Sequence, residues 1–173
     1  MKTVIDTSTL ISLAKINFLE ILKKIRKEIL IPEIVFNEAV IKGEEKSLTD
    51  ATVIKNFIKD NNIKRIIVKD FSLNLIKGKV SKTLAQGDEA VMAAAMQEKI
   101  LEIITNDDGL GKIAASLGIK VSASPDLLLE GLRSKIINFE DYEFFLRNLV
   151  IEKRITSAIA EFYVMEGKKY AKN

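Results

Sequence analysis

Residues 1–15 read MKTVIDTSTLISLAK, and this stretch decides the fold class. Its apolar, β-branched run at residues 3–5 predicts a short buried strand, which ends at the carboxylate of Asp6. The hydroxyl residues at positions 7–9 predict the cap of a helix behind that strand. Asp6 is therefore expected at the carboxyl end of a strand, the edge of an open α/β sheet where ligands bind.

A second strand runs into acids in the same way. Ile103-Ile104-Thr105 is followed by Asn106-Asp107-Asp108. Because the carboxyl ends of parallel strands meet at one edge of a sheet, we expect Asp6 and Asp107 to lie in one cleft.

The rest of the chain alternates short apolar runs with segments of helical periodicity. Further strands are expected at residues 29–31, 63–69, 101–105 and 119–121. Helices are expected at residues 18–25, 33–41, 50–60, 72–80, 87–98, 109–117, 124–134, 138–149 and 157–168. Gly43 is expected to stop one of these helices, Asp50 to cap the next, and Gly118 to end a later one.

Strands separated by helices imply βαβ units with right-handed crossovers. The sequence thus predicts an α/β protein with three α/β/α layers and a mostly parallel sheet of four or five strands. Only helices are expected after residue 135. We therefore predict a main domain over residues 1–134 and a helical C-terminal extension over residues 135–173, packed on the same domain.

Composition limits the possible chemistry. The chain of 173 residues contains no His and no Cys, which excludes thiolate nucleophiles, histidine bases and ordinary zinc sites. It is 47% hydrophobic and 29% charged, without an apolar run of eighteen residues or a signal peptide, so a soluble, cytoplasmic protein is expected and no membrane contact. The net charge of +3 fits either a polyanionic partner or an ordinary lysine-rich surface.

Several acids lie where the predicted fold could bring them together: Asp6, Glu38, Asp88, Glu89, Asp107 and Asp108. Two carboxylates about 5 Å apart repel by roughly 3 kcal/mol at an effective dielectric near 20. A cluster of them would need a divalent ion, and carboxylates suit Mg²⁺ or Mn²⁺. Taken singly, most of these acids also fit helix caps, helix first turns or a solvated helix face.

The order of the acids resembles the PIN-domain family of metal-dependent ribonucleases, which includes the VapC-like toxins of toxin–antitoxin pairs. The resemblance covers about residues 2–130. It rests on four blocks in order: Val4-Ile5-Asp6-Thr7-Ser8 with Leu10-Ile11, Ile31 to Glu38, Gly87 to Ala93, and Ile104 to Asp107.

The resemblance implies a metal site for Mg²⁺ or Mn²⁺ at the carboxyl edge of the sheet. Asp6, Glu38 and Asp107 match its ligand positions, and Thr105 matches a hydroxyl that orients the acids or a water. The third acid stays open: counting back from Thr105 favours Glu89, whereas the position after Gly87 favours Asp88. Asp108 is expected to act as a helix cap.

The expected activity is hydrolysis of RNA by a nuclease domain over residues 1–134, as the toxin of a toxin–antitoxin pair with an antitoxin protein as partner. Two alternatives stay open: a non-toxin PIN nuclease in RNA processing or decay, and a catalytically silent PIN scaffold that binds RNA or protein. A neighbouring antitoxin-like reading frame would favour the first, and loss of one acid would favour the scaffold.

The N-terminal helical segments are apolar over more than one face: Leu10, Leu13, Phe18, Leu19, Leu22 and Ile25. These side chains could all pack inside the chain. Alternatively, a surplus stripe could form a homodimer interface or a groove for an antitoxin helix, and we predict a homodimer that buries part of the segment from Leu10 to Ile25.

Overall fold

The computed structural model describes residues 2–79 and 84–171. Within them, five parallel strands form one sheet in the order β3-β2-β1-β4-β5. The strands are β1 (Lys2–Ile5), β2 (Glu28–Pro32), β3 (Lys64–Ile66), β4 (Glu102–Ile104) and β5 (Lys120–Ser122). The strand order reverses beside β1, because the chain adds β2 and β3 on one side of it and β4 and β5 on the other.

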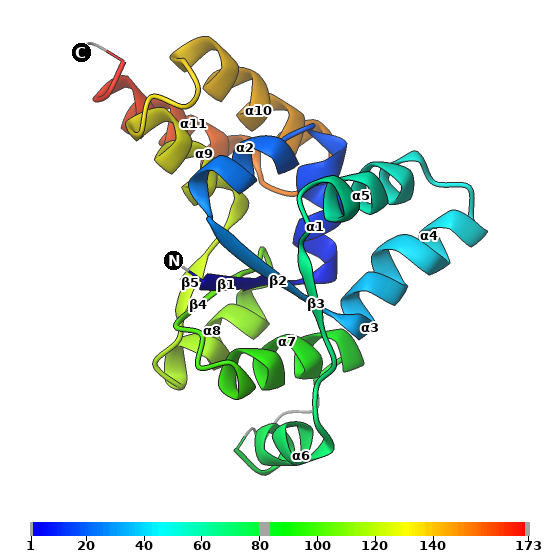
Figure 1. Cartoon of the computed structure of the whole chain (residues 1–173). Coiled ribbons are helices and arrows are strands. Elements are labelled where there is room, and N and C mark those ends of the chain that lie inside the picture. The colour runs from blue at the N-terminus through cyan, green and yellow to red at the C-terminus, as the bar shows by residue number, and fades with distance from the viewer. Residues whose placement is uncertain (1, 80–83, 172–173) are drawn as a thin grey trace.

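Helices cover both faces of this sheet, as Figure 1 shows. The helical segments before β4 are α1 (Thr7–Lys15), α2 (Leu19–Ile25), α3 (Glu33–Phe36), η1 (Asn37–Ile41), α4 (Lys42–Glu45), α5 (Thr49–Asp60), α6 (Asp70–Lys79) and α7 (Gln86–Gln97). Those after β4 are α8 (Asp108–Ser116), α9 (Ser124–Arg133), α10 (Phe139–Ile151) and α11 (Ser157–Lys168). Helices α7 and α8 lie on one side of the sheet, and α1, α2, α5 and α9–α11 lie on the other (Figure 1). The predicted three-layer α/β/α fold is confirmed.

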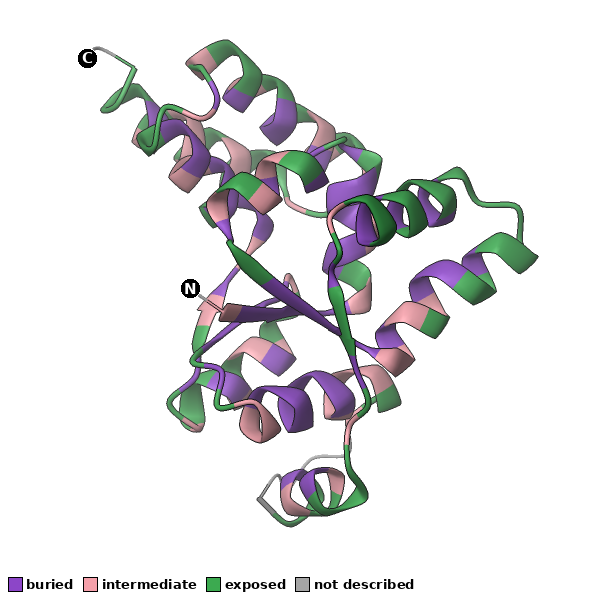
Figure 2. Cartoon of the chain, viewed as in Figure 1, coloured by how far each residue is buried: buried purple, intermediate pink, exposed green. Residues whose placement is uncertain are grey.

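The core runs through the middle of the sheet. Val4, Ile5, Ile103 and Ile104 are fully buried, as strands with helices on both faces require, and Figure 2 shows this burial along the central strands. The edge strands are only three residues long and expose basic side chains such as Lys64 and Lys120, which disfavours pairing with another chain. None of the described helices is both long and apolar enough to span a bilayer.

Most expected elements are present, and Gly118 ends α8 with a φ of +75°, a left-handed conformation that favours glycine. The prediction that Gly43 stops a helix is wrong, because the helical run continues to Glu45. Gly43 is buried where an added Cβ would lie 2.7 Å from the Cβ of Ala51, so its role is close packing of α4 on α5.

Other element boundaries also differ from expectation. Asp50 lies inside the first turn of α5 and Leu48 occupies the cap position, so the predicted cap is wrong. Strand β3 ends at Ile66, whereas residues up to 69 were predicted to belong to it. Helix α6 begins at Asp70, two residues earlier than predicted, and the predicted end of that helix at residue 80 lies outside the described residues.

The apolar segment expected at a dimer interface is buried within the chain. Leu10, Leu13, Phe18, Leu19 and Leu22 are at most 3% exposed. Ile25 is half-buried and packs against the same core. These side chains therefore pack within the chain, and the expected surplus apolar stripe is not present among them. A homodimer stays a prediction, but it needs another surface.

The C-terminal helices pack on the rest of the domain. Tyr142, Phe145 and Leu149 of α10 are buried, and the ring of Phe145 lies edge-to-face with that of Phe18 at 5.2 Å between centroids. Gly167 of α11 lies so close to the ring of Tyr142 that an added Cβ would clash with it. These contacts place α10 and α11 in one hydrophobic core with the sheet-bearing part of the chain.

Candidate functional site

Asp6 lies at the carboxyl end of the central strand β1. Its backbone N–H donates to the carbonyl of Ile104 at 3.1 Å, which joins the end of β1 to the end of β4. This is the point where the strand order reverses, and in open α/β sheets ligands bind there.

The two oxygens of the Asp6 carboxylate have different surroundings. Oδ1 accepts the Thr9 N–H at 2.6 Å and the Ser8 hydroxyl at 3.1 Å, so Asp6 itself caps α1. The expectation that residues 7–9 supply this cap is therefore wrong. Oδ2 is buried and has no hydrogen-bond partner among the described residues. A buried carboxylate oxygen without a donor is destabilising, and a bound cation would satisfy it.

Glu38 is brought to the same edge by the helical run after β2. It lies in η1, a π-helical turn of the kind that often occurs at functional sites. The hydroxyl of Thr7 donates to Glu38 Oε2 at 2.7 Å, which fixes this carboxylate beside the start of α1. A Cβ at Gly87 would lie 2.9 Å from the same oxygen, so glycine at this position lets Glu38 approach the start of α7.

Asp107 follows β4 and caps α8. Its Oδ1 accepts the Leu110 N–H at 2.6 Å, whereas Asp108 lies inside the first turn, so the expectation that Asp108 is the cap is wrong. Thr105 is 2% exposed, and its Oγ1 accepts the backbone N–H of Asp107 at 3.0 Å. The Thr105 hydroxyl thus orders the turn that carries Asp107.

A further hydrogen bond joins the two acid-bearing loops. The backbone N–H of Asn106 donates to Thr9 Oγ1 at 2.9 Å. The side-chain amide of Asn106 is held in turn by Ser124, through its Nδ2 at 2.9 Å and its Oδ1 at 2.8 Å. The start of α1, the turn before α8 and the start of α9 are therefore held together at one edge.

The pKa of Asp88 reflects the negative charge gathered at this edge. Burial, and then the negative charges of Asp6, Asp107 and Glu38, raise the pKa of Asp88 to about 6. Asp88 therefore lies near enough to three carboxylates from other segments to be repelled by them. Because α1, α7 and α8 all begin at this edge, the positive ends of their helix dipoles offset part of that repulsion.

Glu89, the alternative third acid, lies in different surroundings. Its carboxylate is 3.6 Å from Nζ of Lys77 on α6. It lines a mostly apolar cavity of about 440 Å³ together with Ile34, Val68 and Leu73. Asp88 is thus the acid of α7 on which the charges of the other three act, whereas Glu89 faces Lys77 and this cavity.

The four acids are not drawn tightly together. Over residues 2–79 and 84–171, no three acidic side chains lie close enough to share one metal ion as ligands. Like charges without a counter-ion favour such spacing.

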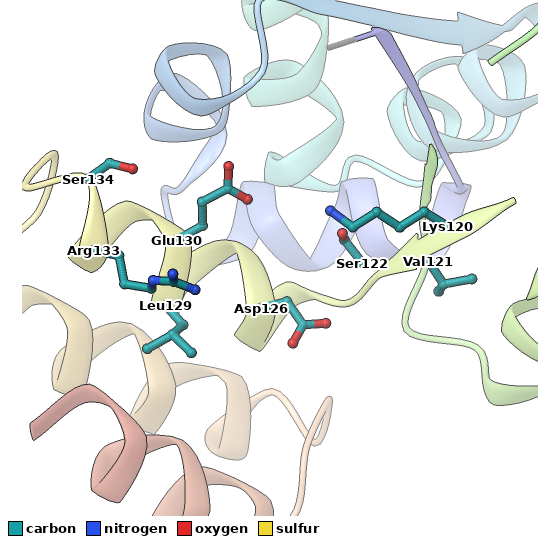
Figure 3. A pocket seen from close by; sticks show the side chains of 8 residues that line it. All are labelled: Lys120, Val121, Ser122, Asp126, Leu129, Glu130, Arg133 and Ser134. Atoms are coloured by element: carbon teal, nitrogen blue, oxygen red, sulfur yellow. The ribbon is translucent and has the colours of Figure 1, made fainter. Parts of the chain in front are cut away.

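A larger cavity, of about 690 Å³, lies away from the acids between β5 and α9 (Figure 3). Its charged side chains already have partners. Lys120 is 3.0 Å from Glu102, Glu130 pairs with Arg26 at 2.6 Å, and the guanidinium of Arg133 lies over the ring of Tyr170. This cavity shows no group left for a reaction.

Sequence reasoning missed several residues that position the acids: Ser8, Thr9, Gly87, Asn106 and Ser124. A hydroxyl, glycine or amide next to an acid is common in any helix cap. The only signal in the sequence was that these residues cluster at the predicted strand ends, which does not show which acid each of them contacts.

Comparison with known families identifies this architecture. The family model DUF3368, described as a PIN domain, matches residues 2–161. A search of curated proteins finds no match to the sequence. The match crosses the predicted boundary at residue 134 and includes α10 and the first part of α11. PIN domains are generally nucleases that use divalent metal ions, and the fold with its acid-lined edge agrees with the match: this chain belongs to the PIN-domain family.

Proposed function

We propose that the protein is a metal-dependent endoribonuclease whose site consists of Asp6, Glu38, Asp88 and Asp107. The observation that carries the proposal is the buried, unpartnered Oδ2 of Asp6 at the point where the strand order reverses. Asp88 takes the place of Glu89 as the third acid, because Asp88 lies among the other carboxylates and Glu89 pairs with Lys77.

The donor set fits Mg²⁺ or Mn²⁺. All of its atoms are carboxylate oxygens, which these hard ions prefer, and the fourfold negative charge calls for a counter-ion. When bound, such an ion would acidify a water, polarise the phosphoryl group and stabilise the leaving oxygen.

The chain's own residues hold the acids in place for this task. The Thr9 N–H and the Ser8 hydroxyl fix Oδ1 of Asp6 and leave Oδ2 free. Thr7 fixes Oε2 of Glu38, and Leu110 fixes Oδ1 of Asp107. Each of these three carboxylates thus has one oxygen engaged by the protein, which limits its rotation and cuts the cost of ordering it on binding.

The RNA substrate and the toxin role rest on the resemblance to VapC-like ribonucleases. A test of the toxin role is induced expression in a bacterial host. Growth arrest by the wild type, relieved by Asp6→Asn, supports it, whereas normal growth with the soluble wild type argues for a role in RNA processing or decay.

The direct test of the activity is cleavage of labelled RNA by the purified protein. We expect cleavage of single-stranded or structured RNA with Mg²⁺ or Mn²⁺, and none with EDTA. Asp6→Asn should lower the rate at least about 100-fold, the scale on which loss of charge stabilisation at a reacting centre acts.

Glu89→Gln is the matched control, because it removes an acid of the same helix turn that faces the other cavity. It should keep most of the activity. Cleavage that survives EDTA, or an Asp6→Asn variant as active as the wild type, would refute the proposal.

A further inference from the structure

A second cavity adjoins the acidic edge. It has a volume of about 560 Å³, within the range of small-molecule sites in proteins. Four segments form it: the turn between β4 and α8, the start of α9, the loop before α11, and α11 itself. Its lining residues are Asn106, Asp108, Ala123, Pro125, Arg154, Ile155, Ala158, Ile159, Phe162 and Tyr163. Asn106 and Asp108 flank Asp107 in sequence, so the cavity shares the turn that carries this proposed metal ligand.

We propose that this cavity binds a nucleobase of the substrate strand next to the phosphodiester that is cut. The inference rests on the proposed function, since it names a substrate subsite of the same active site. Two side chains in the cavity wall support it: the exposed aromatic ring of Phe162 and the positively charged guanidinium of Arg154.

Phe162 supplies the aromatic surface. It is 57% exposed, which is unusual for a phenylalanine that lines a cavity beside a polar site. Its ring lies edge-to-face with that of Tyr163 at 5.5 Å between centroids. Every nucleobase has a π-face, and stacking on an aromatic side chain accounts for much of the affinity for single strands.

The backbone beneath this ring is held from two sides. The Tyr163 hydroxyl donates to Asp126 of α9, and the Tyr163 carbonyl accepts the Tyr142 hydroxyl at 2.6 Å. Burial, and then the hydrogen bond to Asp126 and its negative charge, raise the pKa of Tyr163 well above its ordinary value, so the hydroxyl stays a donor. A ring on a fixed helix loses little freedom when a base stacks on it.

Arg154 supplies the charge. Its guanidinium forms no ion pair, side-chain hydrogen bond or cation–π contact with the described residues, unlike Arg26, Arg65 and Arg133. An unpaired guanidinium beside an apolar wall suits a phosphate with a base attached to it. The amide of Asn106 is already engaged by Ser124, so the subsite is expected to bind bases by stacking with little sequence preference.

An exposed apolar surface could instead bind a protein, and the structure favours a nucleotide on two grounds. The cavity shares the turn that carries Asp107, and the guanidinium of Arg154 in its wall can pair with a phosphate of the strand. An apolar helix face docked here would desolvate Arg154 without pairing it, whereas a nucleotide brings a phosphate together with its base.

The test is fluorescence anisotropy with a short, 3′-labelled single-stranded RNA. All variants are made in the Asp6→Asn background with Mg²⁺ present, so that the probe is not cut. Phe162→Ala should weaken binding about 5- to 100-fold, the effect of removing a stacking aromatic. Arg154→Ala should lower the slope of log K against log salt by about 1, and Arg154→Lys should restore that slope.

Phe144→Ala is the matched control. Phe144 is an aromatic of similar exposure, 59%, but it lies on α10 and lines a different cavity. The inference is overturned if Phe162→Ala binds like Phe144→Ala, if the Asp6→Asn protein binds no RNA, or if light scattering shows that Phe162→Ala dissociates an oligomer. A different result would separate the two proposals. If the wild type cuts no RNA but binds it in a way that depends on Phe162, the proposed function is refuted and the proposed subsite is supported.

Discussion

At the scale of single residues, two acids of the site perform two tasks with their two oxygens. Asp6 and Asp107 each cap a helix through Oδ1, and the second oxygen of each does not take part in the cap. Capping therefore orients these carboxylates. One acidic residue can cap a helix with one oxygen and bind a metal ion with the other. The sequence could not separate them, because both functions favour an acid directly after a strand.

The first prediction concerns the unpartnered oxygen of Asp6. Mg²⁺ or Mn²⁺ at about 100 times its Kd should stabilise the wild type by about 2.7 kcal/mol, or about 5–10 °C in Tm. Asp6→Asn should blunt this gain while it keeps the cap, because Asn caps helices as well as Asp does. Without metal the variant should melt at or above the wild-type Tm, since one like charge is gone. Equal metal shifts in both proteins, measured by thermal melts, would show that no such site exists.

The second prediction distinguishes the neighbouring acids of α7. Asp88→Asn should lose the Mn²⁺-dependent rise in Tm, because Asp88 lies among the other three acids. Glu89→Gln should keep it, because Glu89 faces Lys77 and the apolar cavity. Calorimetric titration with Mn²⁺ checks the same pair. If Glu89→Gln loses the Mn²⁺ effect and Asp88→Asn keeps it, Glu89 and not Asp88 is the third acid of the site.

At the scale of elements, the sequence predicted what periodicity and caps encode. The strands that end at Asp6 and before Asp107, the order of the helices, and the end of α8 at Gly118 are all present. The orientation of α7 on the sheet could not be predicted from the sequence. All six residues from Ala90 to Ala95 are buried, so the helix has no polar face that would indicate which side points to solvent. Without a face, the direction of Asp88 and Glu89 depends on how α7 docks on the sheet.

A buried ionic network joins three elements away from the site. Arg26, after α2, is 2% exposed and donates two hydrogen bonds to Glu102 of β4, at 2.8 and 3.0 Å, and two to Glu130 of α9. Burial works to raise the pKa of Glu102, but the hydrogen bonds from Arg26, Ser122 and Lys120 outweigh it and hold that pKa below its ordinary value.

The third prediction follows from this network. Glu102→Gln should lower the free energy of unfolding at neutral pH by about 1.5–3 kcal/mol, because it weakens the charged hydrogen bonds to the buried Arg26 while Glu130 still pairs with that guanidinium. A lowered carboxyl pKa adds stability above the unfolded pKa of about 4.3, and this stability is lost as the pH falls through the lower folded value. The difference between wild type and variant in urea unfolding should therefore shrink below about pH 4. A difference that stays constant with pH would contradict this account.

At the scale of the whole molecule, the C-terminal helices complete the core. The predicted extension over residues 135–173 supplies Tyr142, Phe145, Leu146 and Leu149 to the interior. The role in substrate binding that we propose for α11 could not be predicted from the sequence, because the exposed apolar residues of these helices follow no motif. The only sequence argument for self-association pointed to α1 and α2, which the structure buries.

The fourth prediction is that the chain needs this extension to fold. Truncation after Ser134 would expose Phe18, which packs on Phe145 of α10, and Leu132, which lies beside Gly167 of α11. We expect an aggregated product or a broad transition at a lower Tm in thermal melts. A truncated protein that melts like the full chain would show that residues 135–173 are an independent appendage. The predicted homodimer is tested separately, by light scattering of the full wild-type chain. Charged substitutions at Leu19 or Leu22 cannot test it, because both side chains are buried and the substitutions would unfold the monomer.

The most direct test of the central claim is the anomalous scattering of a crystal soaked in Mn²⁺. We expect an anomalous peak at the carboxyl edge of the sheet, with Asp6 Oδ2 among its ligands and Glu38, Asp88 and Asp107 turned toward it. Absence of a peak there at saturating Mn²⁺, or a peak bound by Glu89 and not by Asp6, would contradict it.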